Sequence, residues 1–248
     1  MTGIDKAIVY ADLHAPHEDK YAVSILCQVI QDEKPDILIN LGDGGEFDSV
    51  NYFNRNRPLK QEGKRLVKDF RDMIHVENEI ISAAPEAKKR KHTGNHEHRV
   101  NNYLDSNPII EGLIEETIQF NNSVEVIPHG KFSTVGKLMF HHGDRKGYKS
   151  IHHAKQWSSI GRSILYAHFH SVQRFTHETL HRDGKPDKHA AFSIGCLCKL
   201  DRDWMYNQKS LWQQSFGVVY FQKDGFFNFY NIDITNRRAI WNGRIYRG

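Results

Sequence analysis

The sequence predicts an α/β fold in which two mixed β-sheets pack face to face between outer helices, a four-layer α/β/β/α sandwich. The start of the chain alternates strand, helix and strand patterns, and the second half is dominated by short strand-like runs. Two packed sheets with helices outside would bury the apolar faces of both halves. Because 248 residues with 39% hydrophobic content suffice for one large core, we expect a single domain over residues 1–248.

The first three expected elements follow one another as strand, helix and strand. Residues 6–14 and 36–43 are apolar runs that end abruptly in polar residues, as a buried strand does when it delivers side chains to a loop. Between them, the apolar residues of 20–33 recur at helical spacing. This order implies a right-handed crossover and parallel pairing, so both strands end at the same edge of one sheet. Asp12 and Asp43 are therefore expected to be neighbours.

The middle of the chain has helical character. A stripe of apolar residues predicts a long amphipathic helix between residues 63 and 84. The basic run KKRKH at 88–92 leads into TGNHEHRV, and the simplest interpretation is a loop that feeds another helix, with His96 near its N-terminus. A further helical stretch is expected around residues 108–120.

After residue 120 the pattern becomes strand-like, with turn signals at residues 135–137 and 224–225. A second, more antiparallel sheet is implied. The segments that predict it are VEVIP, KFSTV, KLMFHHGD, SILYAHFHS, FSIGCL, FGVVYF and FFNFYNIDI.

Composition restricts the class of protein. The formal charge of +4 assists binding to polyanions without requiring it. No run approaches the roughly 18 to 20 apolar residues of a membrane helix, and the start lacks a signal-peptide layout, so we expect a soluble cytoplasmic protein with no membrane contact. The odd number of cysteines favours a reducing compartment. Of the three, Cys196 and Cys198 are expected to be buried strand residues without a chemical role.

Five short polar motifs each end an apolar run, and each contains metal-ligand side chains. They are DLH at 12–14, GD at 42–43, GNHE at 94–97, HHGD at 141–144 and AHFH at 167–170. Strand ends are rigid platforms, so a metal cluster that requires close placement is best built there. A carboxylate such as Asp43 can bridge two cations through its two oxygens. His168 and His170 point to opposite faces unless the chain curls locally, in which case they could serve different metals.

In this order the five motifs resemble the calcineurin-like metallophosphoesterase family, whose pattern is D-x-H, GD, GNH[ED], HG and GHxH. The resemblance covers about two thirds of the chain, residues 8–170. It implies that one metal is held by Asp12, His14 and His170, the other by Asn95, His142 and His168, and that Asp43 bridges them. His141 is the alternative to His142. His96 resembles the catalytic histidine of the family, which stabilises charge at the phosphate or protonates the leaving oxygen.

Ala167 stands where the family has glycine, and a positive φ at that position would strain the loop. Two cations about 3.5 to 4 Å apart can neutralise phosphate oxygens and lower the pKa of a bridging water. The mixed nitrogen and oxygen donors suit Mn²⁺, Fe or Zn²⁺ better than Mg²⁺ or Ca²⁺. The resemblance favours manganese. Arg99 follows His96 on the same helical face, where it is either a bidentate phosphate donor or a solvated arginine.

The expected substrate is a phosphodiester in nucleic acid or a nucleotide. The basic charge supports this, and the GNHE motif continuing as HRV resembles compact viral and bacterial members of the family. Asn51, Tyr52, Phe53 and Arg55 could stack on and pair with a nucleotide, or pack the segment after GD against the sheet. The KKRKH run could contact phosphates or form a solvated loop.

Three other functions remain open from the residues. A phosphomonoesterase would act on a phosphoprotein or a small metabolite. A non-catalytic scaffold would keep the fold for protein binding, but such relatives usually lose the ligands or the histidine of GNH, and all of these are present here. A pure nucleic-acid binding module would bind in a salt-sensitive way that is indifferent to chelators.

Overall fold

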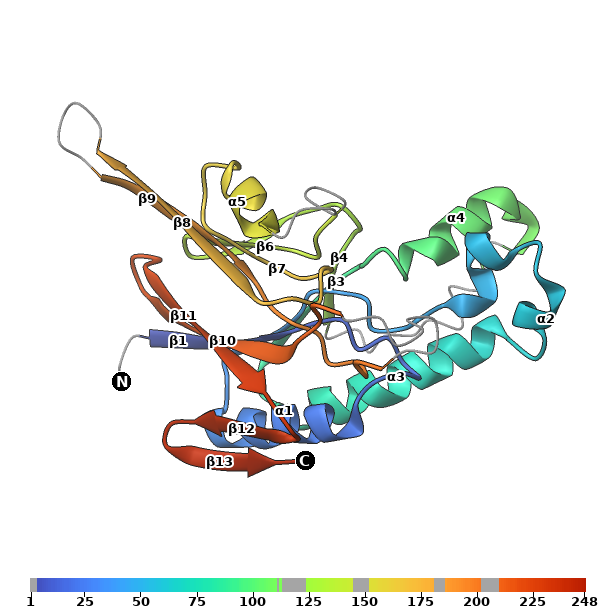
Figure 1. Cartoon of the computed structure of the whole chain (residues 1–248), viewed down its shortest axis with the longest axis horizontal. Helices are drawn as coiled ribbons and strands as arrows, with labels where there is room; N and C mark the ends of the chain where they lie inside the picture. The colour runs from blue at the N-terminus through green and yellow to red at the C-terminus, as the bar shows by residue number, and fades with distance from the viewer. Residues whose placement is uncertain (1–3, 111, 113–123, 145–151, 181–185, 202–209) are drawn as a thin grey trace.

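Two β-sheets lie face to face at the centre of the computed structural model, which describes residues 4–110, 112, 124–144, 152–180, 186–201 and 210–248. Helices cover the outer face of each sheet (Figure 1), so the predicted α/β/β/α sandwich is confirmed. The strand order is β11-β10-β1-β2-β3-β4 in the first sheet and β5-β6-β7-β9-β8 in the second.

The first sheet is mixed, with a parallel centre and an antiparallel edge. Its strands are β1 (Ile4–Tyr10), β2 (Ile37–Asn40), β3 (Lys88–His92), β4 (Val124–Ile127), β10 (Gln214–Gln222) and β11 (Phe227–Ile234). Strands β1 to β4 are parallel, whereas β10 is antiparallel to both β1 and β11. The parallel β1–β2 pair, joined by α1 (Lys20–Glu33), confirms the predicted strand, helix and strand unit.

The second sheet is also mixed. Its strands are β5 (Ser133–Val135), β6 (Leu138–His141), β7 (Ile164–Tyr166), β8 (Gln173–Leu180) and β9 (Pro186–Ser193). Strands β6, β7 and β9 are parallel, and β5 and β8 are antiparallel edges. Three of the seven segments expected here, now β4, β10 and β11, belong to the first sheet instead. The alternation of apolar residues indicates which side chains are buried. It does not indicate which strands pair with one another.

The helices agree with their predicted spans except near residue 110. Helix α1 matches the predicted range 20–33, and α3 (Leu66–Ser82) lies within the predicted 63–84. The shorter helices are η1 (Asp48–Val50), η2 (Tyr52–Asn54), α2 (Pro58–Gln61), α4 (His98–Ser106), η3 (Pro108–Ile110) and α5 (His153–Ser158). The remainder of the helix expected over 108–120 lies outside the described residues, apart from residue 112. No helix in the described ranges is long and apolar enough to cross a membrane.

Three apolar clusters fill the three spaces between the layers. Alternate residues of β1 face opposite ways: Ala7 and Val9 lie between the sheets, whereas Ile8 and Tyr10 face the layer of α1 and α3. On the far side, Trp157 of α5 packs on the second sheet. A hairpin of β12 (Arg238–Trp241) and β13 (Arg244–Arg247) extends the outer layer beside α1 (Figure 1).

The basic run at residues 88–92 is a strand, β3, so its prediction as a loop is wrong, whereas its contact with phosphates stays a prediction. Lys91 is only 4% exposed, and its Nζ lies 2.5 Å from Oε1 of Glu77 on α3. A buried lysine is tolerated because a carboxylate pairs with it. His92 is also buried, and burial lowers the pKa of its imidazole to about 3. The charges within the run do not indicate that Lys91 pairs with Glu77, which lies 14 residues earlier in the chain.

We expect Lys91→Met to lower the free energy of unfolding by about 3 to 5 kcal/mol, because it leaves the Glu77 carboxylate buried without a counter-charge. Adding Glu77→Gln should recover most of this loss, since the amide can still accept from Asn40. Urea denaturation measures both effects. Lys88→Ala, on the exposed start of the same strand, is the control. A loss for Lys91→Met no larger than that of Lys88→Ala would refute the role of the pair.

Candidate metal centre

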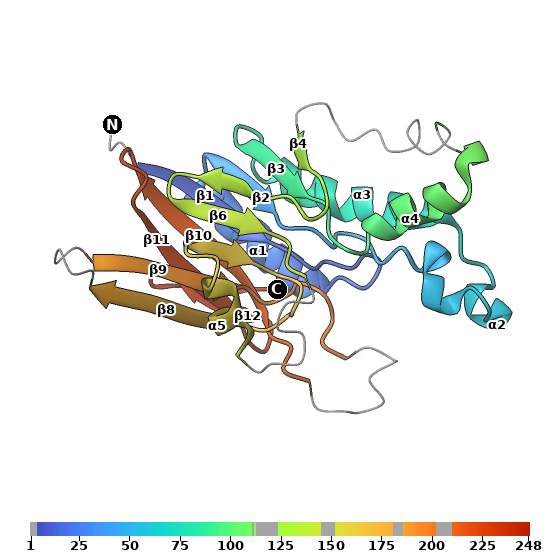
Figure 2. The same ribbon diagram turned by 90° about the horizontal axis from the view of Figure 1, so that it is seen from above.

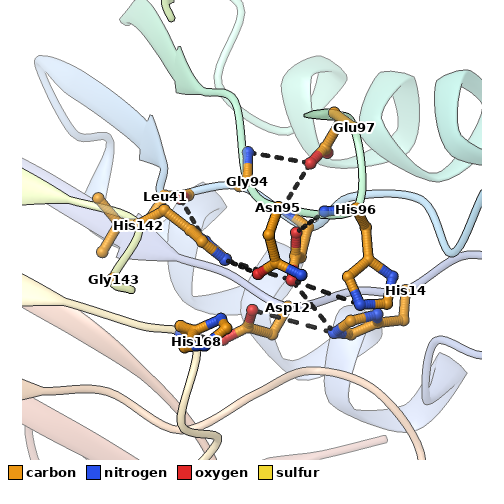
Figure 3. Close-up of polar contacts among 12 residues, drawn as sticks. Asp12, His14, Leu41, Gly94, Asn95, His96, Glu97, His142, Gly143 and His168 are labelled. Carbon is orange, nitrogen blue, oxygen red and sulfur yellow. Dashed lines mark hydrogen bonds and ion pairs between the residues drawn. The ribbon is translucent and has the colours of Figure 1, made fainter. Parts of the chain in front are cut away.

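The five polar motifs meet at one edge of the sandwich, at the carboxyl ends of β1, β2, β3, β6 and β7. The backbone N–H of Asp12 donates to the carbonyl of Gly42 at 3.0 Å, which confirms that the first two motifs are neighbours. The N–H of His168 donates to Oδ2 of Asp12 at 3.1 Å and so joins the two sheets. Figure 3 shows the side chains from these loops converging.

A first donor cluster consists of Asp12, His14 and His170. The Nε2 atoms of the two histidines lie 3.1 Å apart, and Oδ1 of Asp12 lies 3.6 Å from Nε2 of His170. Two nitrogens bound at right angles to a metal at about 2.1 Å would be about 3 Å apart. Within the described structure, the buried Oδ1 of Asp12 has no hydrogen-bond partner. These donors therefore fit a transition-metal cation.

A second donor cluster consists of Asp43, His142 and His168, with Asn95 beside it. Nε2 of His142 lies 3.0 Å from Oδ1 of Asn95 and 3.2 Å from Oδ2 of Asp43. Nδ1 of His142 lies 2.9 Å from the carbonyl oxygen of Leu41, to which its N–H can donate (Figure 3). That hydrogen bond selects the tautomer whose Nε2 lone pair is free for a metal.

Asp43 lies between the two clusters. Its Oδ2 is 3.2 Å from Nε2 of His142 and 3.9 Å from Nε2 of His14, while its Oδ1 accepts from the backbone N–H of His96 at 2.8 Å. Burial raises the pKa of the Asp43 carboxyl, but the neighbouring histidines outweigh it and hold that pKa well below its usual value. The carboxylate is therefore ionised and faces both donor sets.

The electrostatics of the site favour positive charge. Burial alone would lower the pKa of His142, yet Asp43 and Asp12 raise it to about 9. Asp12 and Cys198 likewise raise the pKa of His170 to about 10 against the effect of burial. Metal ions and protons compete for the same imidazole nitrogens, so cation binding here should release protons.

Five residues of the clusters have left-handed backbones, a conformation that side chains other than glycine seldom adopt. They are Asp12, His14, Asp43, His168 and His170, with φ between 50° and 74°. Each costs about 1 to 3 kcal/mol and persists only where surrounding contacts enforce it. The predicted curl at residues 168–170 is thus present. Ala167 is not among the positive-φ residues, so alanine replaces the glycine of the family without strain.

Gly94 and Glu97 hold the GNHE motif against the GD motif. A Cβ on Gly94 would lie 2.1 Å from Oδ1 of Asp43, so only glycine permits this approach. The carboxylate of Glu97 accepts from the backbone N–H groups of Asp43, Gly44 and Gly94 at 2.7 to 3.0 Å. The motif therefore positions the Asp43 carboxylate as well as supplying Asn95 and His96.

His96 lies at the border of the two clusters. Its Nε2 is 3.9 Å from Oδ2 of Asp43, and its ring packs edge-on against His14 at a centroid distance of 4.4 Å. Nδ1 lies 3.0 Å from the carbonyl oxygen of Glu46. Burial lowers the pKa of His96 to about 3, which keeps the imidazole neutral. Although it forms a third possible donor group with His14 and Asp43, its expected role as a catalytic group rather than a ligand stays a prediction.

Glu46 is a site residue that the motif search missed. Its Oε2 lies 3.2 Å from Nδ1 of His14, and its Oε1 lies 3.5 Å from Nδ1 of His96. Burial lowers the pKa of His14, but the Glu46 carboxylate outweighs it and raises that pKa, so Glu46 is an ion-pair partner of a candidate ligand. The sequence does show an acidic residue three positions after Asp43, in the same strand-end loop. Glu46 was missed because the GD motif ends before it.

Arg99 lies at the same border rather than in open solvent, with a side chain 20% exposed. Its Nη1 donates to the carbonyl oxygen of Glu46 at 2.8 Å, and its Nη2 lies 3.0 Å from Nε2 of His96. The guanidinium is therefore engaged with the candidate catalytic histidine. Its contact with a substrate phosphate stays a prediction.

Cys196 and Cys198 are buried as expected, but their expected place in a strand is wrong, because β9 ends at Ser193 and both cysteines form only isolated bridges. They are free and are not remote from the site. Sγ of Cys198 lies 4.0 Å from Nδ1 of His170, on the side of the ring opposite the first cluster. The two cysteines and His170 also form a possible donor group. Sequence reasoning assigned them no role because their spacing matches no common metal motif, whereas folding brings them behind a candidate ligand.

A cavity of about 1090 Å³ adjoins the second cluster. It reaches Asn95 and His168 at one end and runs between α4 and the segment that contains η1 and η2. Its lining residues are Asn51, Tyr52, Phe53, Asn95, His98, Arg99, Asn102, Ser106, His129, Gly143, Asp144 and His168. This groove gives a ligand larger than a phosphate direct access to the metal centre.

The fold and this donor set define a metal-dependent hydrolase. A sequence profile of the calcineurin-like phosphoesterase family matches residues 6–231, so the chain belongs to that family. Among solved structures, vacuolar protein sorting 29 from Cryptosporidium parvum is similar with a TM-score of 0.52 and 13% identity over 99% of both chains. The phosphoesterase Yfce from E. coli is 15% identical over 93% of this chain and 100% of its own, with a TM-score of 0.40. No curated protein sequence matched significantly.

We expect Glu46→Gln to weaken binding of Mn²⁺ by about 10- to 100-fold, because the neutral amide removes the negative charge beside Nδ1 of His14, a candidate ligand. Isothermal titration calorimetry of metal-stripped protein measures the affinity. Asp48→Asn in the same loop is the matched control, since Asp48 pairs with Lys64 instead of a candidate ligand. If Glu46→Gln and the control bound Mn²⁺ with equal affinity, the assigned role of Glu46 in metal binding would be wrong.

Proposed function

We propose that the chain is a two-metal phosphodiesterase that acts on nucleic acid or nucleotides. The observation that carries the proposal is the position of Asp43, whose Oδ2 faces a donor cluster on each side. Two of the neighbouring candidate ligands, Asn95 and His168, line a groove. A carboxylate shared by two sets of imidazole donors suits a pair of cations better than a single one.

The proposed ligands divide as the clusters do. Asp12, His14 and His170 would hold one cation, Asn95, His142 and His168 the other, and Asp43 would be shared. When bound, the cations would neutralise phosphate oxygens and lower the pKa of a shared water. The mixed imidazole and oxygen donors suit Mn²⁺, Fe or Zn²⁺, and the resemblance to the family favours Mn²⁺ among them. The three free cysteines are consistent with the proposed cytoplasmic location.

His96 and Arg99 are proposed to act on the phosphate. The carbonyl of Glu46 accepts the Nδ1–H of His96, which leaves Nε2 directed toward Arg99 and Asp43. A permanent guanidinium charge therefore lies beside the imidazole. This pair can stabilise negative charge that develops on the phosphate or leaving oxygen, and His96 can deliver a proton there if it acquires one.

The size of the groove favours a diester over a monoester. A phosphate at the metals leaves most of the 1090 Å³ cavity for groups attached to the phosphate, and α4 lines that space with polar side chains. A small phosphomonoester would leave it empty. The scaffold alternative is disfavoured because the donors, His96 and Glu46 remain assembled around one point.

Chelation should abolish hydrolysis of bis-p-nitrophenyl phosphate, and Mn²⁺ should restore it, because the proposed reaction requires both cations. His96→Ala should lower kcat by about 10²- to 10⁴-fold while leaving the metal stoichiometry unchanged. His75→Ala, an exposed histidine on α3, serves as the control. Wild-type turnover by His96→Ala would exclude the assigned role.

Wild-type protein should hydrolyse bis-p-nitrophenyl phosphate with a higher kcat/KM than p-nitrophenyl phosphate, since the groove provides contacts for both ester groups of a diester. Parallel steady-state assays with Mn²⁺ make the comparison. A strong preference for the monoester would replace the proposed diesterase with a phosphomonoesterase.

A further inference from the structure

The segment after the GD motif projects away from the sheets. It contains η2 and α2, and both views place α2 at the same end of the molecule as α4 (Figure 1, Figure 2). We call residues 51–65 the rim segment. Two adjacent aromatic side chains on it, Tyr52 and Phe53, are 65% and 72% exposed. They do not pack the segment against the sheet, and adjacent aromatic rings so exposed are typical of a binding surface.

The two aromatic residues belong to the groove that reaches the metal centre. Tyr52 and Phe53 line this groove together with Arg99 and Asn102 of α4, and Asn95, a candidate metal ligand, lines it as well. A ligand that rests on the aromatic rings is therefore continuous with a phosphate at the metals. This continuity distinguishes the rim segment from exposed aromatics elsewhere, such as Phe226 beside the turn between β10 and β11.

The rim segment is also basic. Residues 55–65 contain five Lys and Arg residues and one Glu. The guanidinium of Arg55 stacks on the Tyr52 ring, with Cζ 3.5 Å from the centroid, and this cation–π contact orients the ring. Arg57 and Lys60 are exposed farther along the segment. Aromatic faces followed by cations match the stacking platforms and phosphate contacts of proteins that bind single-stranded nucleic acid.

We propose that the rim segment binds single-stranded nucleic acid, with bases stacked on Phe53 and Tyr52 and backbone phosphates near Arg57 and Lys60, and directs the strand into the groove. This inference rests on the proposed function and specifies its substrate. A duplex keeps its bases stacked on each other, so their faces are not available to the rings.

The first test compares Phe53→Ala with the control Phe226→Ala, which removes an equally large exposed ring outside the groove. Fluorescence anisotropy with short single-stranded DNA and RNA probes, in EDTA to prevent cleavage, should show affinity lower by roughly 5- to 100-fold for Phe53→Ala only. A lower affinity of Phe53→Ala for either the DNA probe or the RNA probe supports the proposal, and the affected probe identifies the polymer. Equal affinities of the two variants, or tighter binding of duplex than of single strands, would overturn it.

The second test concerns the phosphate contacts. Arg57→Ala should reduce the slope of log affinity against log salt concentration by about 0.7, the contribution of one phosphate contact to a single strand. Arg247→Ala, on the exposed hairpin strand β13, is the charge-matched control. An unchanged slope for Arg57→Ala would contradict the proposed path of the strand.

Turnover separates this inference from the proposed function. With Mn²⁺, Phe53→Ala should lower the ratio of kcat/KM for a single-stranded oligonucleotide to kcat/KM for bis-p-nitrophenyl phosphate by roughly 5- to 100-fold. If wild-type protein hydrolysed neither substrate, the diesterase would be refuted, while the anisotropy result would still decide whether the rim segment binds single strands. If both were hydrolysed and the ratio did not change, the rim segment alone would be refuted.

Discussion

Asp43 is the residue on which the candidate metal centre depends, because its carboxylate faces both donor clusters. Its Oδ1 is fixed by the backbone of His96, so its Oδ2 remains directed toward His142 and His14. This arrangement requires four strand-end loops, those after β1, β2 and β3 of the first sheet and after β6 of the second, to meet at one place. The α/β/β/α sandwich provides that meeting point, and the surrounding contacts maintain it.

Holding the donors in place has an energetic cost that the rest of the fold must offset. Five left-handed residues at about 1 to 3 kcal/mol each would not persist on independent loops. The carboxylate of Glu97 ties the GD and GNHE loops together through three backbone N–H groups. Lys91 and Glu77 form a buried pair beneath these loops, with Lys91 3.7 Å from Glu97. The polar network below the site is therefore part of its preorganisation.

Elements set by the spacing of hydrophobic residues along the chain could be predicted from the sequence. Elements that depend on contacts between residues distant in the sequence could not. The helix over 20–33 and the parallel pair of β1 and β2 follow from hydrophobic spacing and chain order. By contrast, β3 was misread because Lys91 is buried only when Glu77 pairs with it. The seven candidate ligands were found because ordered motifs at strand ends are specific. Glu46 and Cys198 lie outside those motifs, and only folding brings them to the site.

The central claim is that two cations share Asp43. Crystals of the protein loaded with Mn²⁺ and measured at the manganese absorption edge would locate the ions directly by anomalous scattering. The account predicts two peaks on either side of Asp43, about 3.5 to 4 Å apart, one beside His14 and His170 and the other beside His142 and His168. A single peak, or none within coordination distance of Asp43, would contradict it.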